Sequence, residues 1–113
     1  MTTNKQEMHQ RVSTIVQEEL DHHFRQQPTF GPIIVQRAVD EFDEDVPVYI
    51  DIKIIFDGDQ EDLDPHWTSG LIRRIRPKLL EIGVEEFPVP SFIEKNEWDQ
   101  WRRRNPEARL EAD

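Results

Sequence analysis

Residues 46–56, VPVYIDIKIIF, decide the fold of this 113-residue chain. Every even-numbered position from Val46 to Phe56 is apolar, whereas the odd positions also hold charged side chains, Asp51 and Lys53 among them. Side chains alternate between the two faces of a strand, so this pattern predicts a β-strand with one apolar face and one mixed face. Because an apolar face of this length has to be covered by helices, we expect this segment to be the central strand of a sheet.

The flanking segments predict the remaining elements. Apolar residues recur at helical spacing before and after the central strand, and β-branched residues at the start of 33–42 favour a second strand. Residues 84–93, rich in apolar residues and proline, favour a third strand. The predicted elements are a helix at 5–26, strands at 33–42 and 46–56, a helix at 65–82, a strand at 85–92, a helix at 94–104 and a frayed tail at 105–113.

Capping residues and breakers predict where the helices begin and end. Thr3 or Asn4 can cap the first helix, Asp64 with Pro65 can start the second, and Ser91 or Asn96 can cap the last. Gly83 should end the second helix.

Pro77 falls inside the second helix. The apolar stripe continues in phase across this proline, which predicts one kinked helix rather than two separate ones.

The connections predict the topology of the sheet. The short turn Asp43-Glu44-Asp45 implies an antiparallel hairpin, and the helical connection to the third strand implies a parallel, right-handed crossover. Pro88 and Pro90 remove donors from one side of the third strand, which suits an edge, and we expect Phe87 and Val89 to face the core.

The sequence therefore predicts a single small α+β domain of order α-β-β-α-β-α with a three-stranded mixed sheet. The predicted strand order is 1-2-3, with 2-1-3 as the alternative, and the helices pack on one face. The two long helices should cover the even face of the central strand.

Composition and charge exclude several classes of protein. The chain has no cysteine, which excludes disulfides, thiolate metal sites and thiol nucleophiles. No segment has the apolar length of a membrane span and the N-terminus does not resemble a signal peptide, so we expect no membrane partner and a cytoplasmic protein. Eleven acidic residues lie between positions 40 and 64 with Lys53 as the one base there, so the net charge of -10 is local.

The predicted order of elements resembles that of KH-like RNA-binding domains, including ribosome-binding factors that assist small-subunit maturation. It is also similar to that of the cytoplasmic domains of cation-efflux transporters. The chain departs from both patterns, because it has no GxxG loop and carries Lys53, not histidine, on the central strand. The resemblance implies a fold and leaves the function open.

The acidic loop after the central strand is a candidate cation site. The first helix ends, and the second and third strands finish, at the same end of the predicted sheet, which should gather His22, His23, His66 and the loop acids there. Carboxylates suit Ca²⁺ or Mg²⁺, and histidines suit Zn²⁺. The candidate ligands are Asp57, Asp59, Glu61, Asp62 and His66.

Catalysis and nucleic-acid binding have weaker support in the sequence. No nucleophile elbow, P-loop or HExxH pattern is present, so no catalytic residue is assigned and an enzyme is disfavoured. Basic residues at 73–78 and 102–104 could contact phosphates, yet the chain is acidic overall and has no aromatic stacking triad on a strand. No cofactor can be assigned.

The remaining candidate surface is the mixed face of the sheet together with the last helix. One short helix cannot cover that face, and contiguous apolar groups left exposed usually mark an interface. Aromatic residues and arginine are the side chains most enriched among binding anchors. The sequence predicts an acidic protein-interaction or accessory module that binds a protein partner or forms a homodimer, with candidate contacts Tyr49, Ile55, Trp98, Trp101 and Arg102. A cation-binding domain or an RNA-associated KH-like domain is the alternative.

Overall fold

A computed structural model describes residues 5–25, 28–39, 42 and 47–105. The predicted caps Thr3 and Asn4, the turn 43–45 and most of the predicted tail lie outside the described residues. Within these described ranges, eight elements follow one another. They are α1 (Lys5–His23), β1 (Thr29–Val39), β2 (Pro47–Asp57), the 3₁₀ helix η1 (Gln60–Leu63), α2 (Pro65–Thr68), α3 (Leu71–Glu81), β3 (Phe87–Glu94) and α4 (Lys95–Arg104).

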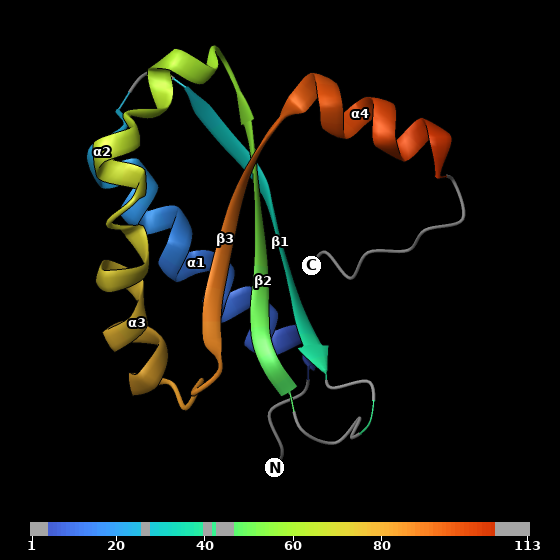
Figure 1. Cartoon of the computed structure of the whole chain (residues 1–113). Helices are drawn as coiled ribbons and strands as arrows, with labels where there is room; N and C mark the ends of the chain where they lie inside the picture. The colour runs from blue at the N-terminus through green and yellow to red at the C-terminus, as the bar shows by residue number, and fades with distance from the viewer. Residues whose placement is uncertain (1–4, 26–27, 40–41, 43–46, 106–113) are drawn as a thin grey trace.

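The three strands form one mixed sheet in the order β1-β2-β3, as predicted. β1 pairs antiparallel with β2, and β3 pairs parallel with β2, so the apolar strand is central and the other two are edges. Figure 1 shows α1, α2 and α3 on one side of this sheet and α4 on the other. The α+β domain and its order of elements are thus those that the sequence predicts.

The main core lies between the sheet and the helices α1 and α3. Ile50, Ile52 and Ile54 of β2 are each 0% exposed, which confirms the predicted apolar face. We call this side of the sheet the helical face. Buried apolar residues from α1, α2, α3, β1 and the segment before β3 complete this core: Met8, Val12, Val16, Leu20, Ile33, Val35, Trp67, Leu71, Ile75, Leu79 and Val84.

β1 begins earlier than predicted, at Thr29 instead of position 33. The Gly31–Pro32 pair interrupts the register between Phe30 and Ile33 as a bulge and does not end the strand. A proline that cannot donate to a ladder is tolerated on an edge strand or in a bulge, and Gly31 adopts a φ of 137° that side chains disfavour. Glycine and proline here shape the strand instead of preceding it.

The predicted single helix over 65–82 is wrong. The chain forms α2 and α3 with a break at Ser69–Gly70, while Pro77 lies inside α3 without dividing it. Asp64 caps α2 and Pro65 occupies its first position, as predicted.

The predicted stop at Gly83 is confirmed. The amide of Gly83 donates to Leu80 O at 3.1 Å, and that of Val84 donates to Leu79 O at 2.9 Å. This pair of bonds is a Schellman motif, in which glycine at positive φ closes the helix.

β3 is an edge strand as predicted, but its faces are reversed. Phe87 and Val89 are 44% and 38% exposed, whereas Pro88 is buried. The register explains the reversal, because Pro88 and Pro90 lie beside Ile50 and Ile52 and so share their helical face. The prolines supply apolar side chains to the core while removing donors from the ladder.

α4 follows β3 without a connecting loop, and Glu94 is both the last strand residue and the helix N-cap. Its side chain makes no capping bond, and neither Ser91 nor Asn96 caps the helix as predicted. Figure 1 shows α4 projecting away from the sheet on the side opposite α1 and α3. The helix leaves much of that side of the sheet uncovered.

Candidate protein interface and the acidic pole

The side of the sheet opposite the helical face carries exposed apolar and aromatic residues. We call it the open face. Ala38, Tyr49 and Phe87 lie side by side across the three strands, and Gln36, Asp51 and Val89 form the next row. Tyr49 is 38% exposed, close to the values for Phe87 and Val89. These side chains share a face because aligned partners in a sheet point the same way.

The part of the open face nearest α4 is closed by one tryptophan. Trp98 is 6% exposed and packs with Ile34, Ile55 and Ile93 in a second, smaller core. Trp101, one turn later, stacks on Trp98 with ring centroids 5.4 Å apart and an interplanar angle of 11°. The side of the Trp101 ring that faces away from Trp98 is uncovered, and 39% of Trp101 is exposed.

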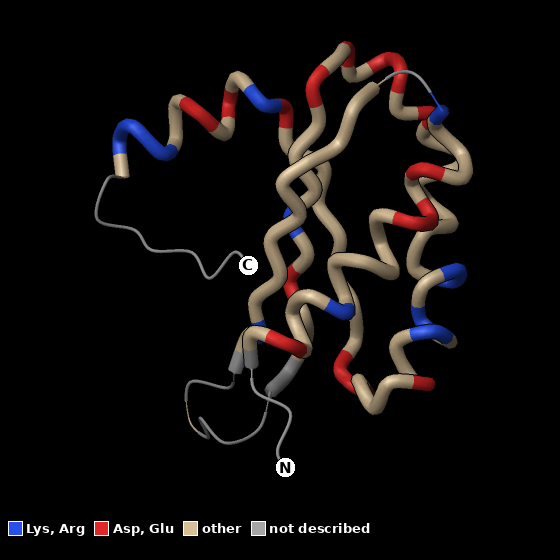
Figure 2. The backbone as a smooth tube through the Cα atoms, turned by 180° about the vertical axis from the view of Figure 1, so that it is seen from behind, with Lys and Arg blue, Asp and Glu red and all other residues tan. Residues whose placement is uncertain are grey.

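Charges on the open face are few and partly paired. Asp51 and Lys53 form an ion pair in the middle of β2, and both side chains are half-buried. The distal turn of α4 carries Arg102, Arg103 and Arg104, all exposed, and Figure 2 shows the basic positions at the far end of this helix. The surface is therefore an apolar patch with a paired charge inside it and a basic arm beside it.

The five predicted interface residues divide into two groups. Tyr49, Trp101 and Arg102 are exposed, whereas Ile55 and Trp98 are buried in the second core and are not available to a partner. Sequence reasoning did not place Phe87 and Val89 on this face. The alternation of β3 could have done so only once the phase of its prolines was known.

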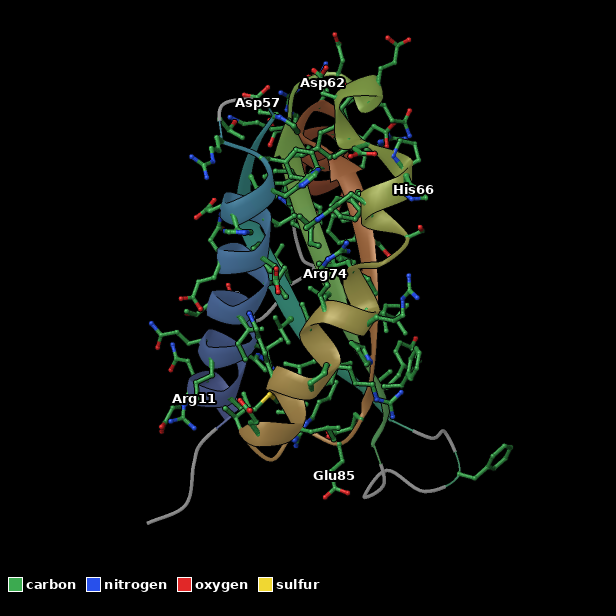
Figure 3. All side chains as sticks on the ribbon, turned by 90° about the vertical axis from the view of Figure 1, so that its left-hand side faces the viewer. Arg11, Asp57, Asp62, His66, Arg74 and Glu85 are labelled. Atoms are coloured by element: carbon green, nitrogen blue, oxygen red, sulfur yellow. The ribbon has the colours of Figure 1, made fainter. Side chains whose placement is uncertain are left out.

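The loop after β2 and the end of α1 form an acidic pole. Figure 3 shows Asp57, Asp62 and His66 at one end of the molecule, and Glu85 at the opposite end. All five predicted ligands are exposed. Among the described residues, no three histidine, aspartate or glutamate side chains lie close enough to hold a metal ion, so this set does not converge into a site.

Two residues at this pole that are not among the five predicted ligands, His23 and Asp64, do contact each other. His23 at the end of α1 lies 3.1 Å from Asp64, measured from Nε2 to Oδ2. The Asp64 side chain also accepts a long bond of 3.4 Å from the amide of Trp67, at a backbone φ of 51°. The hydrogen bond with His23 lowers the pKa of Asp64 below its ordinary value of 3.8, against an opposing effect of desolvation, and the bond from the Trp67 amide acts in the same direction as His23.

Aromatic rings surround this contact. His23 stacks on Trp67 with centroids 4.6 Å apart, and Phe24 contacts both rings edge-on at 4.7 and 5.2 Å. Phe24 in turn packs against Phe30 of β1 at 5.1 Å. The cluster joins α1, α2 and β1, and its arrangement is that of a packed corner, so we assign it a structural role.

Three of the four basic residues of α3 are engaged within the chain. Arg74 donates from Nη1 to Trp67 O at 3.2 Å and lies 5.1 Å from the centre of that ring. Arg76 lies 4.8 Å from the centre of the Phe87 ring, and Lys78 pairs with Glu19 at 3.1 Å. A phosphate ligand would have to compete with these contacts, which disfavours the basic helix as a nucleic-acid surface.

None of the helices in the described part of the chain combines the length and the apolar character needed to cross a membrane. Comparison with family models, with curated proteins and with solved structures finds no match to this chain.

Proposed function

We propose that this chain is a small protein-interaction module that self-associates through the open face of its sheet and through α4. The observation that carries the proposal is the patch of Tyr49, Phe87 and Val89, which lie in two adjacent rows and are exposed on a surface that α4 leaves uncovered. Single exposed apolar residues are common, but a patch of large ones on one sheet face is typical of an interface.

The composition of the surface favours a protein over other partners. Tyrosine, phenylalanine and tryptophan bury a large apolar area with few rotatable bonds, which is why aromatic residues dominate binding anchors. Trp101 is held by its stack on Trp98, so docking of a partner would cost little further side-chain entropy. The Asp51–Lys53 pair lies inside the patch and is already internally neutralised.

A second copy of the chain is the partner that this surface suits best. In a two-fold arrangement the same patch meets itself, and the projecting α4 of each copy can lie against the open face of the other. The basic arm of residues 102–104 would then approach a second copy whose excess of acidic residues lies between positions 40 and 64. Opposite charges at the rim would speed association and fix its orientation.

The alternatives from the sequence have less support. A cation site needs converging ligands, and the described residues bring no three candidate ligands together. An RNA-associated function would use the basic side of α3, where three of the basic side chains already have partners in the chain. The open face is the surface on which exposed aromatic residues gather.

The test is the mass of the chain in solution over a range of concentrations, by light scattering after size exclusion. Val89→Lys places a charge in the exposed patch, and Trp101→Ala removes the aromatic anchor. Both changes should lower the mass without unfolding the chain. Leu80→Ala is the matched control, since Leu80 is 50% exposed on α3, away from the open face.

Thermal melts of the same variants separate the proposal from a purely structural role. A monomeric wild type whose Trp101→Ala variant melts much earlier would mean that the indole only closes the second core. An unchanged mass for both variants, with a wild type that does associate, would exclude this face as the interface. Lowered mass with the melting temperature retained supports the proposal.

A further inference from the structure

The two edges of the sheet differ in whether they can accept another strand. β3 contains Pro88 and Pro90, and because its inner side pairs with β2, prolines two residues apart leave donors missing from its outer side. β1 has its one proline at the bulge, and the segment Ile33–Ala38 has none. Within the described part of the chain, β1 forms backbone pairs with β2 alone. One edge is blocked and the other is able to pair.

Proteins commonly protect an open edge with charge, and β1 has little. Arg37 is the single charged residue of the strand, and its Nε lies 2.7 Å from Glu86. Ile34 and Val35 are 2% and 1% exposed, so the strand is anchored on both faces of the sheet, and its pairing with β2 is regular from Ile33 to Ala38, between two register shifts. An unprotected edge of this kind is a template for strand addition.

The residues of β1 are compatible with antiparallel pairing to the same strand of a second copy. Full overlap of Ile33–Val39 with itself places Gln36 opposite Gln36 across the two-fold axis. Arg37 then faces Val35 of the second copy, so no like charges meet, and Ile34 faces Ala38 on the open face. Facing glutamine side chains can hydrogen-bond to each other at the centre.

α1 is also compatible with this arrangement. Figure 3 shows α1 over the β1 side of the sheet and α3 over the β3 side. Glu19 pairs with Lys78 of α3, which fixes the flank of α1 that faces inward. Gln10, Ser13 and Gln17 are spaced for one helix face, opposite to that of Glu19, and carry no charge. The bordering acid Asp21 accepts a hydrogen bond of 2.9 Å from Gln17 Nε2, so the flank is mainly polar and uncharged.

We infer that β1 pairs antiparallel with β1 of a second copy and forms a continuous six-stranded sheet. This inference deepens the proposed self-association by adding a second contact between copies, at the edge of the sheet. It would also place the two open faces side by side in one surface. Main-chain hydrogen bonds would supply affinity, and the central Gln36 pair would set the register.

A charge exchange at Gln36 tests the inference. Gln36 is half-buried on the open face, so lysine or glutamate can be accommodated in the monomer. Gln36→Lys alone and Gln36→Glu alone should each weaken the edge contact by at least about tenfold, because like charges meet at the two-fold axis. An equimolar mixture should restore the assembly as a mixed pair. Leu80→Lys, at a position 50% exposed on α3 and on the β3 side of the sheet, adds the same charge and should change nothing.

Hydrogen exchange of the wild type gives a readout that needs no variant. Alternate amides in 33–39 should gain protection as concentration rises, because every second amide of an edge strand points outward. Protection that does not depend on concentration would overturn the inference.

The edge contact through β1 and the contact through the open face can be tested separately. Loss of mass with Gln36→Lys but not with Val89→Lys would support the edge contact and exclude the open face. The reverse result would overturn the edge contact and leave the proposed function intact. Because Gln36 also lies on the open face, loss of mass with both variants would support both contacts only together with concentration-dependent protection of the amides in 33–39, and without that protection it would overturn the edge contact. A wild type that is monomeric at every concentration would exclude both.

Discussion

Ile52→Ala tests the assignment of the two faces of the sheet. Ile52 is 0% exposed and lies between Val35 of β1 and Pro90 of β3, beneath the helices of the main core. The change removes three carbon groups, worth about 0.8 kcal/mol each on transfer from water. The cavity adds a further cost, because strands on both sides and helices above limit collapse, so we expect the upper half of the usual range of about 2–5 kcal/mol.

The assay is urea unfolding of the wild type and of the variant, followed by circular dichroism, with equal slopes required before midpoints are compared. Val89→Ala is the matched control, because it shortens an apolar side chain on the same sheet at a site 38% exposed on the open face. It should cost less than about 1 kcal/mol. Both variants are measured below the concentration at which the wild type associates.

An Ile52→Ala cost below about 1 kcal/mol would refute the reasoning, since a buried central position cannot lose that much volume so cheaply. A Val89→Ala cost equal to that of Ile52→Ala would mean that the open face is also a packed core. Either outcome would remove the basis for the proposed interface. The expected contrast between the two variants would confirm that only the helical face is closed.

Two further predictions concern local contacts. Asp64→Asn keeps an acceptor for the Trp67 amide but removes the negative charge of the carboxylate that contacts His23. Since the pKa of Asp64 is lowered in the folded state, the wild type should be more stable than the variant above pH 3.8. Thermal melts at decreasing pH should show this advantage vanish as the pH falls below that value. Gly83→Ala meets no atom within 4 Å but has to adopt a φ of 84°, so urea unfolding should show a loss of about 1 kcal/mol from backbone strain alone.

The topology was predictable from the sequence because its main signals are local and repeated. The alternation in 46–56 predicted the central strand and the burial of Ile50, Ile52 and Ile54. The hairpin and the helical crossover followed from the lengths of the connections. These signals depend on the period of the pattern and tolerate errors of a few residues at the ends.

The errors share one physical cause. Glycine and proline restrict the backbone, but whether they end an element depends on the tertiary setting. Gly31–Pro32 forms a bulge because β1 is an edge, Gly70 breaks the helix that Pro77 does not, and Pro88 is a core residue. A sequence pattern shows the conformational preference of a glycine or proline. It does not show the tertiary neighbours that decide whether the residue ends an element.

The candidate site was predicted in outline and not in its contacts. The open face and α4 were expected to stay partly exposed, and Tyr49 and Trp101 are exposed. The contribution of Phe87 and Val89 depended on the phase of β3. The residues of the predicted pole do gather at one end of the molecule. The contact between a histidine and an acid there joins His23 to Asp64 and not the predicted ligands, because the orientation of a side chain in an exposed loop depends on residues distant in the sequence.

The direct passage from β3 into α4 couples two parts of the molecule that are usually independent. Glu94 pairs with Phe56 as the last residue of the strand and also begins the helix, so no linker exists to absorb movement. α4 cannot swing away from the sheet unless Trp98 leaves its core and the last pairs of β3 open with it. Release of α4 and fraying of the end of β3 are then one opening event. The free energy of that event sets how often the open face changes shape.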